Sequence, residues 1–211
     1  VSESLKRKYK KNFKKNFQVI YSFPEYENLK SKIIKKKIKI IHHGICSKNR
    51  KIENYIVVAK LLGKKYEVNC MLKIVDKAYF KYLKSLSANV KNFKFINPVT
   101  TRKISKKINN YDIGLIILLK ESSNHMMSMP NKLFEAIQGK LCVISTPTID
   151  IKNFINKNKC GCISKEFTPE SIATTIRSLN KKQIFNYKKI SNKISIKFSN
   201  KVNEKIWNKI L

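Results

Sequence analysis

The sequence predicts an α/β fold: a Rossmann-like parallel sheet with helices on both of its faces. Short apolar runs alternate along the chain with longer segments of helical periodicity, which is typical of repeated β–α units. The run at 113–119 is apolar almost throughout, as expected of a strand that is buried on both faces. A chain of 211 residues can bury about 70% of its unfolded surface, which is enough for one such domain.

The first half of the chain contains three of the expected strands. Isoleucines alternate with polar residues up to Gly44, which predicts a strand followed by a turn. Gly63 is a stop signal for the helix that follows, and Asp76 is a typical cap for the next helix. The expected strands and helices of this half lie at 37–43, 49–62, 68–75, 76–86, 93–96 and 101–109.

The second half continues the alternation. Pro130 suits the first position of a helix, Gly139 suits its left-handed closing position, and Thr168 with Pro169 predicts another helix start. The expected elements lie at 113–119, 130–138, 141–145, 151–155, 160–164 and 168–179. Repeated β–α units imply a parallel sheet with right-handed crossovers, and such sheets bind ligands beyond the carboxyl ends of their strands.

The helix start at Pro130 has the properties of an anion site. The first amides of a helix have no partner within it, and the helix dipole is positive at that end. Glu135 follows about one and a half turns further along the helix. A helix start that can hold phosphate, close to a carboxylate that can hold a sugar hydroxyl, suggests a nucleotide-sugar site.

The stretch P-N-K-L-F-E at 130–135 resembles the donor-binding domain of GT-B glycosyltransferases, in particular glycosyltransferase family 4. The run I-I-H-H-G at 40–44, followed by Arg50, looks like the first strand, glycine turn and basic helix start of that family. Y-D-I-G-L at 111–115 looks like one of its later strands. Some members carry two glutamates eight positions apart. Met127 stands at the earlier position here, so half of that signature is missing.

The resemblance implies roles for the matching residues. Arg50 and Lys132, with the amides of the Pro130 helix, hold the leaving diphosphate, Glu135 contacts the ribose, and the backbone at 97–99 flanks the base. Ser128 and Asn124 lie in a polar loop that can approach the donor sugar. The candidate donor-binding residues are Gly44, Arg50, Asn97, Val99, Ser128, Pro130, Asn131, Lys132 and Glu135.

Each of these residues also has a plainer interpretation. Gly44 can be only a tight turn, and Arg50 only a solvated residue in the first turn of a helix, although a cation is unfavourable there. Lys132 and Glu135 are three positions apart and can pair on the helix surface.

The histidines give no catalytic assignment. We expect one of His42 and His43 to be packed, and His125 can simply be exposed. No nucleophile–base pair and no paired carboxylates stand out, so the catalytic residues remain unknown, as expected of a domain that binds a donor.

The resemblance also implies a domain organisation. Residues 1–35 resemble the end of an amino-terminal acceptor domain and its linker: a strand end, a basic helix with Leu5, Tyr9 and Phe13, and a strand at 18–24. Residues 36–182 are expected to form the donor domain, and 183–211 a carboxyl-terminal helical segment. We therefore expect a sequence that begins inside the first domain: a truncated product, one half of a split protein or an incomplete coding sequence.

The formal charge of +33 raises the possibility of a basic module that binds RNA or an anionic membrane. Only four of the 46 basic residues are arginines, the lysines are spread over the whole chain, and no RNP-like stacking motif is present. Specific nucleic-acid binding is therefore not expected. The cluster at Lys35–Lys37 can contact anionic lipid at the membrane periphery.

Cysteine content and hydropathy indicate a cytoplasmic protein. The five cysteines are odd in number and suit buried thiols better than a disulfide framework. Cys160-Gly161-Cys162 lacks the spacing of a zinc site, so no metal is expected. No membrane span or secretory start is present in the sequence.

The favoured interpretation is the donor domain of a retaining, metal-independent glycosyltransferase, inactive on its own, with no cofactor beyond its nucleoside-diphosphate-sugar substrate. The acceptor is expected to be a surface polysaccharide or a lipid-linked glycan, bound by the missing domain. The alternatives are an inactive remnant of a donor domain and the basic module described above.

Overall fold

The computed structural model describes residues 2–120 and 126–207 of the chain. Six parallel strands form one sheet in the order β3-β2-β1-β4-β5-β6. The strands are β1 (Ile38–Cys46), β2 (Tyr66–Ile74), β3 (Phe93–Ile96), β4 (Ile113–Ile116), β5 (Cys142–Ser145) and β6 (Gly161–Ile163). The predicted α/β class and parallel sheet are confirmed. The strand order reverses between β1 and β4, where Ile40 pairs with Ile113, so a ligand site is expected at that seam.

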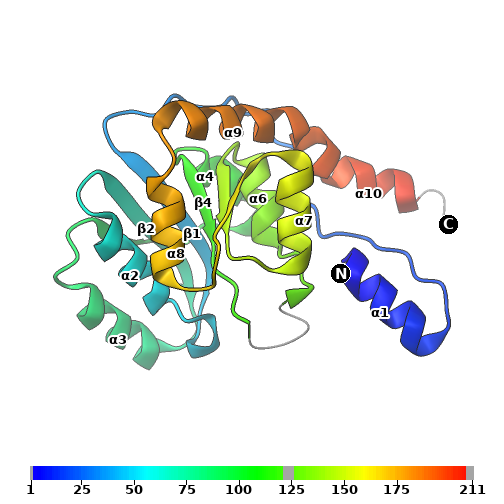
Figure 1. Ribbon diagram of the computed structural model, residues 1–211, viewed down its shortest axis with the longest axis horizontal. Coiled ribbons are helices and arrows are strands. Elements are labelled where there is room, and N and C mark those ends of the chain that lie inside the picture. The colour runs from blue at the N-terminus through cyan, green and yellow to red at the C-terminus, as the bar shows by residue number, and fades with distance from the viewer. Residues whose placement is uncertain (1, 121–125, 208–211) are drawn as a thin grey trace.

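Helices cover both faces of the sheet (Figure 1). The α2 face is covered by α2 (Glu53–Leu62), α3 (Lys77–Ser87) and α8 (Pro169–Arg177). The α6 face is covered by α4 (Ile104–Ile108), α6 (Asn131–Gln138) and α7 (Ile149–Asn158). Helix α9 (Lys181–Ile194) crosses the end of the sheet at which the strands begin, and α10 (Asn200–Trp207) follows it.

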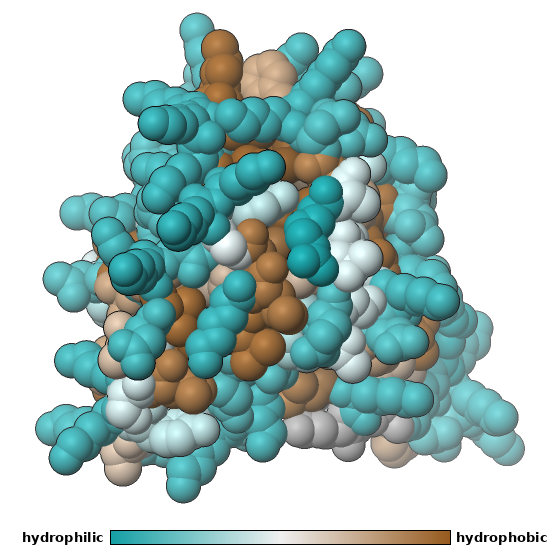
Figure 2. Space-filling model, turned by 60° about the vertical axis from the view of Figure 1, so that its left-hand side comes forward, coloured by the Kyte–Doolittle hydropathy of each residue, from teal (hydrophilic) through white to brown (hydrophobic). Residues whose placement is uncertain are grey.

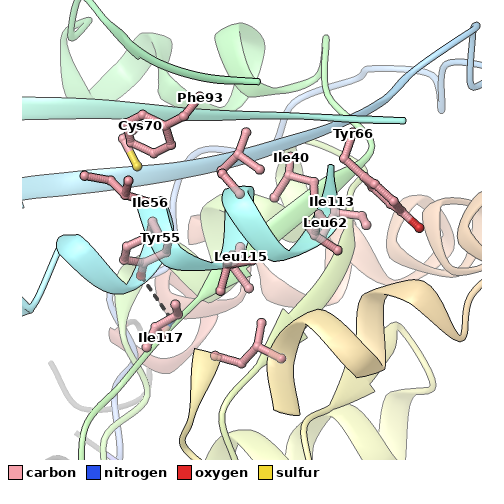
Figure 3. Packing of buried hydrophobic residues seen from close by; sticks show 14 of the residues in the cluster. Ile40, Tyr55, Ile56, Leu62, Tyr66, Cys70, Phe93, Ile113, Leu115 and Ile117 are labelled. Carbon is pink, nitrogen blue, oxygen red and sulfur yellow. Dashed lines mark hydrogen bonds between the residues drawn. The ribbon is translucent and has the colours of Figure 1, made fainter. Parts of the chain in front are cut away.

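The core of the α2 face consists mainly of aliphatic side chains. Ile40 of β1, Ile113 of β4 and Ile56 of α2 belong to this core, and all three are fully buried (Figure 3). The Tyr55 hydroxyl lies in the same core and accepts a hydrogen bond of 3.0 Å from the Ile117 amide. This bond explains why β4 ends at Ile116, three residues earlier than predicted. The backbone leaves the sheet there, and its next two amides, of Ile117 and Leu118, donate to the side-chain hydroxyls of Tyr55 and Thr146.

Two helix caps were predicted correctly. Asp76 accepts a hydrogen bond from the Tyr79 amide at 2.8 Å, and Thr168 accepts one from the Ser171 amide at 3.2 Å. The predicted helix at 49–62 is wrong at its start. Lys48–Arg50 form a separate 3₁₀ turn, Lys51 is left-handed with a φ of 46°, and α2 begins at Glu53.

The expectations for Pro130 and Gly139 also need correction. Pro130 is the extended residue before α6, and the first helical residue is Asn131. Gly139 has a φ of −74°, and the left-handed position belongs to Lys140, with a φ of 57°. Gly139 is required for packing instead, since a Cβ at that position would lie 2.6 Å from Cγ1 of Ile108 in α4.

The segment before the sheet packs against the α6 face. Helix α1 (Glu3–Phe13) forms as expected, and its Ser4 hydroxyl donates to Asp150 of α7 at 2.6 Å. The strand implied at 18–24 is absent from the described residues. Tyr21 and Phe23 instead lay their rings against Phe134 of α6, with centroids 5.5 and 4.6 Å away.

The lysines are spread along the whole chain. Figure 2 shows one face of the protein, on which hydrophilic residues are widespread and surround several apolar areas. The five cysteines are free thiols and four of them are buried, as expected. Within residues 2–120 and 126–207, no helix is both long and apolar enough to cross a bilayer.

Candidate functional site

A cavity of about 430 Å³ opens at the carboxyl ends of the strands, beside the start of α6. It therefore lies where a parallel sheet is expected to bind its ligand. Three parts of the chain contribute most of its wall: the second half of β1, the turn after β3, and the first half of α6. The lining residues are His42, His43, Gly44, Ile45, Arg50, Met71, Lys73, Pro98, Val99, Thr101, Ile104, Pro130, Asn131, Lys132 and Glu135.

The two histidines of β1 point to opposite faces of the sheet, as neighbouring strand residues must. His42 stacks on Tyr55 of α2, with 3.9 Å between the ring centroids. Burial, followed by the positive charge of Lys132, lowers the pKa of His42 well below its usual value. His42 is therefore a neutral, packed side chain at the cavity wall.

His43 faces α6 and pairs with Glu135. Its Nε2 lies 2.7 Å from Oε2 of Glu135, and both residues are more than nine-tenths buried. A carboxylate only accepts hydrogen bonds, so Nε2 of His43 carries the proton that it donates. The alternative of a surface pair between Lys132 and Glu135 is wrong, since no such ion pair exists among the described residues.

Lys132 is one of the cations that line the cavity. Burial, with the charge of Arg50 as the second cause, lowers the pKa of its amine to about 8. No carboxylate of the described residues lies within 4 Å of this amine. A bound anion would supply the missing negative charge and stabilise the protonated lysine.

Gly44 lies inside β1 and not in a turn after it, which corrects that expectation. Its φ of 155° lies in a region that L side chains rarely adopt. A Cβ built on Gly44 would lie 3.5 Å from Nζ of Lys132 and 3.7 Å from Nε2 of His42. The glycine therefore brings bare backbone to the cavity beside the lysine amine.

Arg50 is exposed at the mouth of the cavity, at the end of the 3₁₀ turn. It is not in the first turn of an α-helix, so the expected conflict with a helix dipole does not arise. The chain segments that the structure describes offer its guanidinium no ion pair. Arg50 is close enough to Lys132 for each charge to act on the other.

Part of the cavity wall is apolar. Pro98, Val99 and Ile104 line it, which gives a flat ligand ring a surface to pack against. Asn97 is exposed and lies outside the lining, and Ser128 is likewise not part of it. Asn124 and His125 lie outside the described residues.

The cavity thus brings together seven of the nine predicted donor-binding residues: Gly44, Arg50, Val99, Pro130, Asn131, Lys132 and Glu135. Sequence analysis missed the role of His43 beside Glu135 and the contributions of Met71, Thr101 and Ile104. No cluster of three or more potential metal ligands occurs among residues 2–120 and 126–207. Cations, a carboxylate and apolar side chains in one cavity suit a ligand with anionic, hydroxylated and planar parts.

Known proteins share both the sequence pattern and the fold. A family model described as "Glycosyl transferases group 1" matches residues 25–196. The C-terminal domain of the glycosyl transferase group 1 family protein LpcC from Francisella tularensis superimposes with a TM-score of 0.60 at 16% identity, covering 82% of this chain and 95% of that one. No curated protein matches the chain.

Two longer structures are also similar. TarM from S. aureus, solved with fondaparinux, alpha-GlcNAc-glycerol and UDP, gives a TM-score of 0.77 at 15% identity, over 99% of this chain and 42% of TarM. HepE from Anabaena, solved with UDP and glucose, gives a TM-score of 0.68 at 11% identity, over 83% of this chain and 48% of HepE. The chain spans less than half the length of these two proteins.

Proposed function

The chain belongs to the glycosyl transferases group 1 family, and from this we propose that it binds a nucleoside-diphosphate sugar as the donor half of a retaining glycosyltransferase of family 4. The observation that carries the proposal is the convergence of Arg50, Lys132, the start of α6 and Glu135 on one cavity. TarM and HepE, which share the fold, were solved with UDP, which makes a nucleoside diphosphate the first ligand to test.

The cations and the helix start would hold the diphosphate. Phosphate oxygens at this position would accept charge-assisted hydrogen bonds from Lys132 and Arg50 and from amides at the start of α6. Negative charge develops on the leaving diphosphate as the sugar bond breaks, and fixed cations stabilise it without having to reorganise. The resemblance implies transfer that is independent of a metal, and these two side chains would supply the positive charge for it.

Glu135 and the apolar wall would hold the nucleoside. The Glu135 carboxylate accepts hydrogen bonds from ribose hydroxyls, and the base lies against Pro98 and Val99. The acceptor, a surface polysaccharide or a lipid-linked glycan, would be bound by a second domain. We therefore expect no appreciable sugar transfer by the 211-residue chain alone, since enclosure between two domains contributes much of the rate in such enzymes.

Calorimetry with two kinds of ligand tests the assignment. UDP, ADP and GDP are titrated first, and the tightest binder is compared with pyrophosphate, which has no ribose. Arg50→Ala should weaken both ligands by about ten- to a hundredfold, because a charge-assisted hydrogen bond contributes roughly 1.5–3 kcal/mol. Glu135→Gln should weaken the nucleoside diphosphate and leave pyrophosphate nearly unchanged.

Arg177→Ala is the matched control, since Arg177 is an exposed arginine in α8 that does not line the cavity. Parental affinity in both Arg50→Ala and Glu135→Gln, with the fold intact, would refute the assignment. In that case a donor-domain remnant without a working site becomes the better interpretation.

A further inference from the structure

The pairing of His43 with Glu135 is the most constrained polar contact in the cavity. The two side chains come from residues that lie 92 positions apart, one on β1 and the other on α6, and they meet at 2.7 Å. Only 9% of the His43 side chain and 10% of the Glu135 side chain are exposed. A short hydrogen bond with so little access to water leaves the carboxylate few other orientations.

This bond uses one carboxylate oxygen and leaves the other available. Oε2 of Glu135 accepts from His43, whereas Oε1 accepts no hydrogen bond within the part of the chain that the structure describes. Glu135 lines the cavity, so a ligand bound there can reach its carboxylate. The site thus holds a carboxylate acceptor in a set position, in the same cavity wall as Lys132 and Gly44.

We propose that His43 is a positioning residue: it fixes the Glu135 carboxylate and so makes the cavity selective for ribonucleoside over 2′,3′-dideoxyribonucleoside diphosphates. This inference rests on the donor-binding function proposed above. A glutamate side chain has several rotatable bonds, and holding it in the bound orientation before the ligand arrives reduces the entropy cost of binding. A pre-positioned acceptor also rejects strongly a ligand that lacks the matching hydroxyls, because the carboxylate oxygen that faces the ligand then gains no hydrogen bond in exchange for the water it loses.

The test measures the ratio of the affinities for the tightest-binding ribonucleoside diphosphate and its 2′,3′-dideoxy counterpart by calorimetry. His43→Leu removes the donor, and this ratio should fall by about tenfold, as expected when one ordered hydrogen bond no longer discriminates. The affinity for pyrophosphate, which has no ribose, should stay within about twofold of the parental value, well below the tenfold that corresponds to one such bond. His43→Gln places an amide N–H near the same position and should restore most of the ratio.

Two further variants exclude a merely structural role. His43→Asn is polar but too short to reach Glu135, so it should behave like His43→Leu and replaces it if the leucine variant does not fold. In a Glu135→Gln background, His43→Leu should cause no further change in the ratio, because the two residues act as one unit.

Three outcomes would overturn the inference: an unchanged ratio in both His43→Leu and His43→Asn, equal losses of nucleoside diphosphate and pyrophosphate, or a full further loss in the Glu135→Gln background. Failure of the parent chain to bind any nucleoside diphosphate or pyrophosphate is a different result. It refutes the proposed function itself, and this inference with it.

Discussion

Both faces of the sheet have an apolar core, and the α6 face adds a set of polar anchors around the end of α6. On the α2 face, aliphatic side chains such as Ile56 and Leu83 fill the space between helices and strands. On the α6 face, directed hydrogen bonds from both ends of the chain hold the end of α6. Gln138 accepts from the Glu27 amide at 3.1 Å and donates to the Ser195 carbonyl at 2.6 Å, and Lys140 donates to the Ser195 hydroxyl at 2.8 Å.

This difference matters for the site because α6 carries two of the cavity residues. Lys132 and Glu135 have to be held at set positions, and hydrogen bonds constrain direction in a way that apolar contacts do not. Helix α6 is therefore anchored at its carboxyl end by polar side chains, while its amino end lines the cavity. Mutations in the aliphatic core of the α2 face, away from Tyr55 and the His42 ring that stacks on it, should change stability without changing the site. Mutations among the anchors should change both.

The largest effect is expected at the ion pair that attaches α9 to the sheet. The Lys188 amine, fully buried, donates to Asp112 Oδ1 at 2.7 Å and to the Tyr111 carbonyl at 3.0 Å. Lys188→Met should reduce the free energy of unfolding by about 3–5 kcal/mol, because it leaves the Asp112 charge buried without a counter-charge. Urea unfolding measures this loss.

The matched control for that change is Lys188→Met combined with Asp112→Asn. The asparagine keeps an acceptor for the Lys39 amide, which now donates to Asp112 at 2.9 Å, but carries no charge. The double variant should be more stable than Lys188→Met alone. Equal stability of the two variants would show that the buried charge is not the cause.

The second effect tests the α2 face directly. Ile56 is fully buried between α2 and the sheet. Ile56→Ala should destabilise the protein by about 2–5 kcal/mol through lost contacts and a residual cavity. Its affinity for nucleoside diphosphate, measured by calorimetry on the folded fraction, should equal that of the parent. A large loss of affinity would mean that the two faces are not independent.

The third effect tests the polar anchors. Gln138→Leu leaves the Glu27 amide and the Ser195 carbonyl without their partner, which should destabilise the fold by about 1–3 kcal/mol. Unlike Ile56→Ala, it should also weaken nucleoside-diphosphate binding, because α6 carries Lys132 and Glu135. Parallel unfolding and calorimetry experiments on the two variants provide the comparison. Unchanged affinity in Gln138→Leu would show that these hydrogen bonds do not position Lys132 and Glu135.

The smallest effect is a dependence of binding on pH. The pKa of Lys132 is lowered to about 8, mainly by burial, and a diphosphate prefers the protonated amine. Affinity should therefore fall as the pH rises above that value, by at most about tenfold per pH unit. Lys132→Met should abolish this fall. Arg50→Ala should move it to higher pH, because the charge of Arg50 contributes to lowering the pKa.

Much of the fold was predictable from local signals. The strand at 93–96 and the caps at Asp76 and Thr168 depend on neighbouring residues only, and they were predicted correctly. The exchange of roles between Gly139 and Lys140 was not predictable, because it depends on contact with Ile108 of another helix. Local pattern likewise could not show that Lys51 interrupts the helix expected at 49–62.

The site was predicted less completely than the fold. The helix start at 130–135 was recognised by its composition and its family resemblance, and it does line the cavity. The partner of Glu135 could not be identified, because the contact with His43 depends on how α6 is positioned over β1. Nothing in the sequence links the two residues to each other. The position of His43 directly before Gly44, in an apolar strand, indicated only that it could lie near the ligand.

The order of the strands also determines how the protein must assemble. Strands β1 to β3 come from one continuous stretch of chain and β4 to β6 from the next, so each half can form from contacts between residues that are close in sequence. The seam between them pairs Ile40 with Ile113, far apart in the chain, and such long-range pairing is slow to form. His43 lies on one side of this seam and Glu135 on the other. During synthesis, the ligand cavity can therefore exist only after both halves have left the ribosome and docked.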